Sequence, residues 1–357
     1  MKVKIGDLTK IRTGKLDANA SSEDGQYPFF TCSRETLKIS SYSYDCECVL
    51  VAGNGDLNVK YYNGKFDAYQ RTYIIEDNSN GKLYMPYLYY FMEGYVEELR
   101  KQAIGGVIKY IKLRNLTDAL IELPSFDKQK KVVNILEKSK RILDLQKKEI
   151  LKLDDLIKAR FVEMFGDCDD MVSISDLCSI ITDGTHQSPK FQESGIPFIL
   201  VSNLSNNTVT YNTEKYISEE TYNELYKRTP IEKGDLLLST VGSYGHPAVV
   251  TENTRFLFQR HIAYLKPKRE VVNSFYLHSA LLAPDGQRQI EEKVKGIAQK
   301  TLNLSEIRTI RIPVPEIEEQ NAFEDFVHQV TKSKVVVQKA LDETQLLFDS
   351  LMQQYFG

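Results

Sequence analysis

The chain closes on "SLMQQYFG" (Ser350 to Gly357), and a closely similar stretch, "RFVEMFG" (Arg160 to Gly166), occurs near its middle. Both stretches end in Phe-Gly, 191 positions apart. The same offset relates further pairs: Gln129 and Gln320, Pro124 and Pro315, and Leu113 and Leu304. Residues 111–166 therefore overlay 302–357 without a gap. An ungapped block of this length indicates an internal repeat, which decides how the whole fold is built.

Shorter matches continue the repeat towards the start of the chain. "IGDL" (Ile5 to Leu8) resembles "ISDL" (Ile174 to Leu177) at an offset of 169, and "YPFF" resembles "IPFI" at the same offset. Gln70-Arg71 matches Gln259-Arg260 at 189, and Gly53 matches Gly242 at 189. We therefore expect two copies, 1–166 and 167–357, with about 20 extra residues in the second between Ile199 and Gly242.

The last part of each copy has the pattern of a long helix. "LPSFDKQKKVV" (Leu123 to Val133) and "VPEIEEQNAF" (Val314 to Phe323) both place proline, then acidic residues, before an apolar-periodic run. Proline ends the preceding extended segment, and carboxylates stabilise the positive end of a helix dipole. No further Pro or Gly follows until Gly166 and Gly357, where a C-terminal cap belongs. The pattern predicts helices over 125–166 and 316–357, each roughly 60 Å long.

Apolar residues recur along both predicted helices with the four–three spacing of a coiled-coil seam. The predicted helix-pairing residues are Val132, Leu136, Leu143, Ile150 and Ile157 in the first, and Phe323, Val327, Val337, Leu341 and Phe348 in the second. Residues 125–166 carry a net charge of +4 and residues 316–357 a net charge of −5. Opposite charges favour pairing of the two helices with each other. The alternative is two solvated helix faces with an incidental charge imbalance.

The front part of each copy, 1–124 and 167–315, has a different texture. Short β-branched and aromatic runs such as "CVLVAG" and "DLLLST" are separated by Gly, Asn and Asp turns, which predicts strands. One helix is expected in each front part, beginning at Pro86 in the first and near Ser274 in the second. The expected fold class is mixed α/β, with two α/β domains and two long helices.

Composition excludes several classes of protein. The 357 residues carry a net charge of −3, so no global basic signature announces a nucleic-acid binder. No apolar run approaches the roughly 20 residues that span a bilayer, and the start has no apolar signal segment. The five cysteines are irregularly spaced and do not form a disulfide framework. We therefore expect a cytoplasmic protein with no membrane contact.

Motifs of catalysis are absent from the sequence. There is no phosphate-binding Gly-x-x-x-x-Gly-Lys-Ser/Thr loop, and "AGNGD" (Ala52 to Asp56) lacks the third glycine of a dinucleotide-binding turn. The Asn/Asp-Pro-Pro-aromatic tetrapeptide of amino-methyltransferases does not occur. "CEC" (Cys46 to Cys48) lacks a second ligand pair, and the five histidines show no metal-ligand spacing. The prediction is no catalytic residue and no metal site.

The loops of the front parts are rich in side chains that bind nucleic acids, as in "NGDLNVKYYNGKFDAYQRTY" (Asn54 to Tyr73) and "TDGTHQSPK" (Thr182 to Lys190). Arg, Lys, Asn and Gln read base edges, whereas Lys and Tyr hold phosphates. The predicted DNA-binding residues are Lys15, Arg34, Asn54, Asn58, Lys60, Gln70, Arg71, Lys109, His186, Gln187, Lys190, Ser243, Tyr244, His246, Gln259, Arg260 and Lys300. The alternative is ordinary polar loop surface, with the duplicated Gln-Arg as a structural pair that braces the loop.

Taken together, these features resemble the specificity subunits of type I restriction–modification systems. The resemblance covers essentially the whole chain. It rests on the two helix starts with their Pro and Gln, the two equal helices, the "MFG" and "YFG" endings, and the stretches "YPFFTCS" and "VAGNGDLNVKYYNGKFDAYQRTY".

The resemblance implies a division of labour along the chain. Residues 1–124 and 167–315 would be two target recognition domains, each reading one half of a gapped double-stranded DNA site. Residues 125–166 and 316–357 would be the central and distal spacer helices, packed antiparallel as a pseudo-twofold repeat with the chain termini close together. The implied partners are two methyltransferase subunits and, where the system has one, a restriction or motor subunit.

The resemblance also implies that this chain is not an enzyme and has no cofactor of its own. S-adenosylmethionine and ATP would bind the partner subunits. Two other functions remain open at this point: a self-contained DNA methyltransferase or nuclease, and a coiled-coil scaffold that does not bind DNA. The front domains carry net charges of 0 and −2, so we expect the isolated chain to bind DNA weakly.

Overall fold

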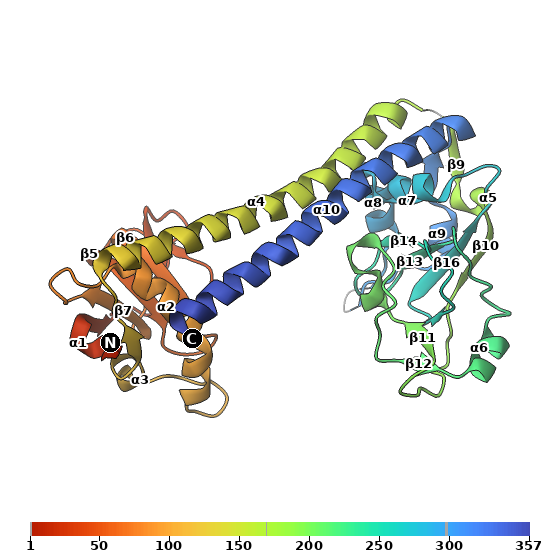
Figure 1. The fold of residues 1–357 in the computed structure, drawn as a ribbon. Coiled ribbons are helices and arrows are strands. Elements are labelled where there is room, and N and C mark those ends of the chain that lie inside the picture. Colours follow the sequence, from red (N-terminus) through yellow and green to blue (C-terminus); the bar gives the residue numbers. More distant parts are fainter. Residues whose placement is uncertain (1, 169, 297–298) are drawn as a thin grey trace. The chain divides into compact units, whose positions relative to one another are not determined.

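The computed structural model describes residues 2–168, 170–296 and 299–357 (Figure 1). Its contacts divide the chain into two compact units. The first unit comprises Met1–Lys147 with Lys339–Gly357, and the second comprises Lys148–Gln338. Both boundaries fall inside a long helix, at positions related by the repeat offset of 191. Each unit therefore contains one front domain and a part of both long helices.

The first unit is built on a six-stranded sheet with the order β2-β7-β5-β6-β3-β4, beside the small pair β1-β8. Its neighbouring strands pair antiparallel, except that β3 and β6 are parallel. Its elements are β1 (Lys2–Lys4), α1 (Ile5–Leu8), β2 (Thr9–Thr13), η1 (Ala18–Ala20), β3 (Tyr27–Phe30), β4 (Leu37–Ile39), β5 (Tyr44–Ala52), β6 (Val59–Ala68), β7 (Thr72–Asp77), α2 (Met85–Gln102), α3 (Leu113–Thr117) and β8 (Leu120–Glu122).

The second unit distributes its strands over three sheets with the orders β10-β16-β13-β14, β12-β11-β15 and β17-β9. Its elements are β9 (Met171–Ser173), α5 (Ile174–Leu177), β10 (Cys178–Asp183), β11 (Ile196–Ile199), η2 (Val201–Asn207), β12 (Tyr216–Ile217), α6 (Glu219–Leu225), β13 (Leu236–Ser239), β14 (Pro247–Val249), β15 (Leu257–Phe258), β16 (Ile262–Pro267), α7 (Ser274–Leu282), α8 (Pro284–Lys293), α9 (Leu304–Arg308) and β17 (Arg311–Pro313). The insertion expected after Ile199 holds η2, β12 and α6. The predicted mixed α/β class is confirmed.

Alternation along strand β5 explains how the first sheet is buried on both faces. Val49 and Val51 belong to the apolar cluster that contains helix α2, whereas Cys48 and Leu50 belong to a separate cluster with Phe66. Successive strand residues point to opposite faces, so an apolar run fills two cores at once. Helix α2 covers one of these faces, because nine of its residues, including Leu88 and Met92, are buried.

The helices expected after the strands are present in both units. Pro86 lies in the first turn of α2, where a residue without an N–H is tolerated. In the second unit the Asn273 side chain caps α7 by accepting hydrogen bonds from the backbone N–H groups of Phe275 (2.9 Å) and Tyr276 (3.2 Å). Pro284 separates α7 from α8, because proline has no backbone N–H to donate to the preceding turn and therefore cannot lie inside a continuous helix.

The two long helices are α4 (Phe126–Phe165) and α10 (Ile317–Phe356), with 40 residues each. In the first unit, the beginning of α4 and the end of α10 share one core with α2. Val132 and Leu136 of α4 are buried there, and Met352 and Phe356 of α10 pack against the same cluster. The ring centroids of Tyr87 and Phe356 are 5.0 Å apart.

In the second unit the roles of the two helices are exchanged. The end of α4 contributes Phe161 and Phe165, and the beginning of α10 contributes Phe323. The rings of Phe165 and Tyr276 have centroids 5.0 Å apart, and those of Phe161 and Phe323 are 5.5 Å apart. Because each unit joins the start of one helix to the end of the other, the helices are antiparallel, as expected.

All ten predicted helix-pairing residues are buried or half-buried. Val132, Leu136, Leu143, Phe323 and Val327 are buried, whereas Ile150, Ile157, Val337, Leu341 and Phe348 are half-buried. In the second unit an ion pair joins Lys334 of α10 to Asp154 of α4. The lysine of this pair lies on α10, which has a negative net charge, and the aspartate lies on α4, which has a positive one. This ion pair is therefore opposite in sense to the net-charge attraction expected from the sequence. No helix in the described part of the chain is long and apolar enough to cross a membrane.

Candidate nucleic-acid interface

Five loop segments of the first unit are tied together by hydrogen bonds; we call 14–17, 30–34, 53–60, 69–71 and 103–111 the first loop cluster. The Gln70 backbone N–H donates to the carbonyl of Leu16 (2.9 Å), and that of Gly53 donates to the carbonyl of Arg71 (2.8 Å). The Gly55 N–H donates to the carbonyl of Lys109 (3.0 Å). The cluster thus contains eight of the predicted DNA-binding residues: Lys15, Arg34, Asn54, Asn58, Lys60, Gln70, Arg71 and Lys109.

The second unit repeats this arrangement in the second loop cluster, which comprises 184–187, 240–246, 259–261, 295–296 and 299–302. The backbone N–H groups of Arg260, Thr240 and Gly242 donate to the carbonyls of Thr185 (3.1 Å), His261 (3.0 Å) and Lys300 (3.2 Å), respectively. Eight predicted residues lie in it: His186, Gln187, Ser243, Tyr244, His246, Gln259, Arg260 and Lys300. Lys190 lies on the loop before β11, outside the cluster, with its side chain exposed.

One close backbone approach is repeated in both clusters. A Cβ added at Gly14 would lie 2.1 Å from the carbonyl oxygen of Ala68, and one added at Gly184 would lie 2.2 Å from that of Phe258. No side chain fits at either distance. Glycine is therefore required where segment 14–17 approaches the end of β6, and where segment 184–187 approaches the end of β15. This shared constraint shows that the two clusters are copies of one design.

The hydrogen bonds correct the predicted register between the copies. Gln70 and Arg260 make the equivalent bonds to Leu16 and Thr185. The Gln-Arg matching was therefore wrong by one residue. Gly242 corresponds to Gly55 rather than to Gly53, since each donates to the carbonyl of an equivalent lysine, Lys300 or Lys109. Both glycines have positive φ values, 75° and 69°, which glycine adopts readily.

Three predicted residues of the first cluster are held by the protein itself. The Arg34 Nε donates to Asp56 Oδ2 (2.6 Å), and this pairing lowers the pKa of Asp56. The Asn58 side-chain amide donates to the carbonyls of Cys32 (2.9 Å) and Asp56 (2.8 Å). Lys60 donates to the carbonyl of Ser33 (2.5 Å), and burial lowers its pKa. These residues brace the loops.

Most of the other predicted DNA-binding side chains of the first cluster face solvent. Lys15, Gln70, Arg71 and Lys109 are exposed, and Asn54 is half-buried. The Gln70 amide donates to Asp17 Oδ1 (2.9 Å). Within the described part of the chain, Lys15, Arg71 and Lys109 have no ion-pair partner. Three uncompensated cations on one loop cluster create a local positive field that the neutral total charge of the domain conceals.

Several polar side chains of the second cluster are paired. The His186 Nε2 lies 2.9 Å from Asp183, which also accepts from Arg228 (2.7 Å). Glu291 accepts from Tyr244 (2.5 Å) and Lys300 (3.0 Å), and the Tyr244 hydrogen bond lowers its pKa.

The remaining predicted residues of the second cluster divide into held and accessible side chains. His246 Nδ1 lies 3.0 Å from Asn207 Oδ1, so this imidazole is tied to the η2 segment. Arg260 is exposed and contacts the neighbouring His261 ring through its Nε (3.3 Å). Gln187 and Ser243 are exposed, and Gln259 is half-buried. Arg260 is therefore an accessible cation of the second cluster, and its position is equivalent to that of Gln70 in the first cluster.

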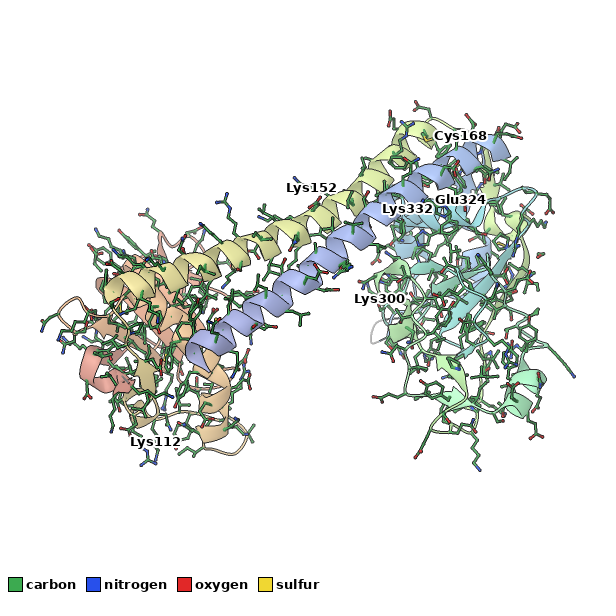
Figure 2. The ribbon with its side chains drawn as sticks, in the orientation of Figure 1. Lys112, Lys152, Cys168, Lys300, Glu324 and Lys332 are labelled. Carbon is green, nitrogen blue, oxygen red and sulfur yellow. The ribbon has the colours of Figure 1, made fainter. Side chains whose placement is uncertain are left out.

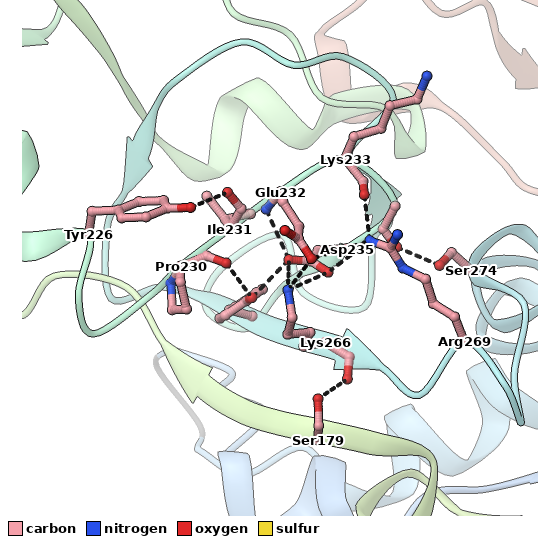
Figure 3. Close-up of polar contacts among 12 residues, drawn as sticks. Ser179, Tyr226, Pro230, Ile231, Glu232, Lys233, Asp235, Lys266, Arg269 and Ser274 are labelled. Atoms are coloured by element: carbon pink, nitrogen blue, oxygen red, sulfur yellow. Dashed lines mark hydrogen bonds and ion pairs between the residues drawn. The ribbon is translucent and has the colours of Figure 1, made fainter.

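A polar network braces the strands that lead into the second cluster (Figure 3). Asp235, which is fully buried, accepts hydrogen bonds from the Tyr264 hydroxyl (2.8 Å) and the Glu232 N–H (3.0 Å). Lys266 of β16 donates to Glu232 (2.6 Å) and lies 3.3 Å from Asp235. Burial raises the pKa of Asp235, and these donors oppose that effect. The network fixes β13 against β16.

One prominent element of the first cluster was missed by the sequence reasoning, which named only Lys109 within it. Residues 104–110 form a hairpin closed by reciprocal backbone hydrogen bonds between Ile104 and Tyr110 (3.0 and 2.9 Å). The side chain of Val107 at its tip is fully exposed, at 104%. The stretch "IGGVIKY" carries a signal, because a glycine pair between aliphatic residues indicates a turn.

No group of three or more His, Cys, Asp or Glu side chains able to hold a metal occurs among the described residues. All five cysteines are free thiols. What the two clusters offer chemically is hydrogen bonding and positive charge at the ends of strands.

Comparison with known proteins gives consistent results. The profile of the family described as "Type I restriction modification DNA specificity domain" matches residues 1–154 and 169–343. The EcoDI specificity subunit of Escherichia coli is 38% identical over 156 residues, 44% of this chain and 34% of that protein. The EcoBI specificity subunit is 22% identical, covering 86% of this chain and 71% of that protein.

Solved structures show the same fold. The chain superposes on the crystal structure of the type I restriction–modification S subunit from M. genitalium with a TM-score of 0.63, at 15% identity, covering 100% of this chain and 96% of that one. A chain from a study of complex assembly and conformational transition of the type I R-M system gives a TM-score of 0.60, at 16% identity and with coverages of 100% and 97%. The EcoDI match, by contrast, spans about a third of that subunit's length.

Proposed function

Because the chain belongs to the family of type I restriction modification DNA specificity domains, we propose that it is the sequence-recognition subunit of a type I restriction–modification complex. Residues 1–124 and 167–315 are the two target recognition domains of this proposal, and each reads one half of a gapped double-stranded DNA site. The observation that supports it most is the pair of loop clusters. Each has the same pattern of backbone hydrogen bonds within itself, but the two differ in their side chains.

A duplicated frame with different side chains suits a reader of two unlike half-sites. Sequence is read by side chains that contact base edges, whereas the backbone frame only positions them. Arg71 and Gln70 are the proposed base-reading residues of the first cluster, and Arg260 and Gln259 those of the second. Lys15, Lys109 and Lys190 are proposed phosphate contacts.

The spacer helices α4 and α10 set the distance between the half-sites in this proposal. Each is 40 residues long, which corresponds to about 60 Å of continuous helix. A helix pair of fixed length acts as a ruler, so the gap in the DNA site follows from the number of residues between the two front domains.

Exposed apolar residues on the spacer helices supply the docking surfaces for two methyltransferase subunits. Helix α4 exposes Ile135, Ile142, Leu145, Leu151, Leu156 and Val162, and helix α10 exposes Val335, Val336, Leu346 and Leu347, by 40–70%. Exposed apolar surface is typical of protein interaction sites. Catalysis, S-adenosylmethionine and ATP belong to these partners, and a complex that acts on chromosomal DNA works in the cytoplasm.

The proposal is tested by methylome sequencing. A host that expresses this chain with the methyltransferase of its system should carry methylated adenines at one bipartite sequence motif. A host that expresses the methyltransferase alone should lack that motif. Methylation without a motif, or an identical motif in both hosts, would contradict the proposal.

A further inference from the structure

The 104–110 hairpin presents aliphatic side chains to solvent on a hydrogen-bonded frame. Val107 is 104% exposed and Ile108 is 63% exposed. Gly105 has φ +121°, and a Cβ there would lie 2.6 Å from the Ile108 carbonyl oxygen, so the turn depends on glycine. The hairpin is anchored to the first loop cluster by the bond from the Gly55 N–H to Lys109 and the bond from the Ile111 N–H to Gly53 (2.9 Å).

The second unit has polar residues at three of the equivalent hairpin positions. The second unit builds the same frame: Lys295 and Thr301 exchange backbone hydrogen bonds (3.0 and 2.8 Å), and Gly296 has φ +104°. There the residue that corresponds to Ile108 is Gln299, and Lys295 and Thr301 replace Ile104 and Tyr110. The same frame therefore carries polar residues at these three positions in the second domain, whereas the residues that correspond to Gly106 and Val107, Ile297 and Ala298, lie outside the described part of the chain.

The surroundings of the apolar tip are strongly basic. Residues 100–117 contain five Lys or Arg and no Asp or Glu, whereas residues 291–308 contain four and three. Lys109, Lys112 and Arg114 are exposed and have no ion-pair partner in the described part of the chain. Lys112 lies at the edge of the first unit (Figure 2). This charge is complementary to a phosphate backbone.

We propose that the 104–110 hairpin enters a groove of the DNA and that Val107 and Ile108 contact the bases directly. The inference rests on the proposed function and assigns the contact to two residues. Aliphatic side chains recognise the thymine methyl group and base steps by van der Waals contact, without hydrogen bonds. Lys109, Lys112 and Arg114 hold the flanking phosphates. Basic flanks favour DNA over a protein partner as the occupant of the tip.

The test uses the full chain in complex with its methyltransferase subunits. The double variant Val107→Ser/Ile108→Ser is compared with the conservative variant Val107→Ile/Ile108→Leu. Leu120→Ser is the matched control, because it removes a 52% exposed aliphatic side chain from strand β8 of the same unit. The dissociation constant is measured for a duplex with the site methylated by the wild-type complex and for a scrambled duplex. Complex assembly is followed by gel filtration, and folding by thermal unfolding.

The serine variant should bind the specific duplex roughly 10- to 100-fold more weakly and relax methylation at the first half-site only. Binding to the scrambled duplex and complex assembly should not change, and the conservative variant should recover most of the affinity. Wild-type affinity and an unchanged first half-site in the serine variant would overturn the inference. Loss of methyltransferase from the serine variant would also overturn it, because the tip would then be a protein contact. If the serine variant unfolds, the same dissociation constants and methylated sites are measured for Val107→Ala instead. A wild-type complex that does not distinguish the two duplexes would instead refute the proposed function.

Discussion

Gln129 and Gln320, 191 positions apart, make the same three hydrogen bonds at the beginning of the two long helices. Each side-chain oxygen accepts a backbone N–H, from Tyr84 (2.8 Å) or Asn273 (2.9 Å). Each amide nitrogen donates to two carbonyls, one of which belongs to a proline just before the helix, Pro124 (2.9 Å) or Pro315 (2.8 Å). Both side chains are fully buried.

Replacing either glutamine by alanine should therefore destabilise the unit to which it belongs. The substitution leaves three backbone groups without their side-chain partner, and we expect a loss of roughly 2–4 kcal/mol in the free energy of unfolding. Urea denaturation of Gln129→Ala and Gln320→Ala measures this loss. Gln345→Ala, which removes an exposed side chain bonded to Asp349 (2.9 Å), should have little effect. Equal stability of all three variants would contradict the role of the two buried residues.

The buried carboxylate of Asp235 predicts a large effect of Lys266→Met. The substitution removes the ammonium group 3.3 Å from a fully buried carboxylate. Breaking one side of a buried ion pair costs about 3 kcal/mol. The midpoint of thermal unfolding should fall for Lys266→Met. Arg255→Met breaks the exposed ion pair with Glu219 and should leave that midpoint nearly unchanged. A midpoint of Lys266→Met close to that of the wild type would show that the network does not brace β13.

A histidine in the second unit predicts how stability depends on pH. Burial lowers the pKa of His278 below its ordinary value of 6.5, although its ring nitrogen contacts the Asn207 carbonyl (3.1 Å). The folded chain therefore binds a proton at this imidazole less readily than the unfolded chain, which takes one up below about pH 6.5. Stability should thus fall as the pH drops below that value, by at most about 1.4 kcal/mol per pH unit.

Urea denaturation between pH 7.5 and about 5 tests this dependence. His278→Gln keeps a polar side chain at this position without a titrating ring, so its stability should fall less steeply with acid. An identical pH dependence of wild type and variant would assign the effect to other groups.

The placement of Arg71 and Arg260 in different loop clusters predicts separable effects on recognition. Arg71→Ala should relax the first half-site and leave the second intact, and Arg260→Ala should do the reverse. If the arginine makes a bidentate contact with guanine, the loss in binding free energy is about 1–3 kcal/mol. Methylome sequencing of hosts that carry each variant reads both half-sites at once. A change in both half-sites from either single variant would argue against independent readers.

The proposed ruler predicts a change in gap length when the spacer helices are lengthened. Seven residues inserted after Lys147 and seven after Gln338 add about 10.5 Å to each helix and nearly preserve its apolar face. The methylated site should then have a gap roughly three base pairs longer, with both half-sites unchanged. A four-residue insertion near Lys147 alone rotates the face of α4 as well and should impair complex assembly. An unchanged gap in the paired insertion would refute the ruler.

The repeat and its helices were predictable because their signals are local. Pro124 and Pro315 mark helix starts, Gly166 and Gly357 follow the helix ends, and apolar spacing marks the seam between them. The Gln-Arg matching failed by one residue because a dipeptide occurs by chance, whereas the structural register is fixed by hydrogen bonds such as that from Arg260 to Thr185. The glycine pair of the 104–110 hairpin indicates a turn, but the exposure of Val107 at its tip was missed because local sequence does not show which aliphatic residues stay exposed.

The sequence by itself determined that the chain is a duplicated α/β protein with two forty-residue helices, because helical periodicity and turn residues act over a few positions. Only the tertiary structure decided which ends of α4 and α10 share a core, and which polar loop residues are accessible. Arg34, Asn58 and Lys60 stay predicted DNA contacts, and the structure adds that each is bonded within the protein, to Asp56, Cys32 or Ser33. Their partners lie 22 to 27 residues away along the chain, and such contacts form only when separate loops are brought together.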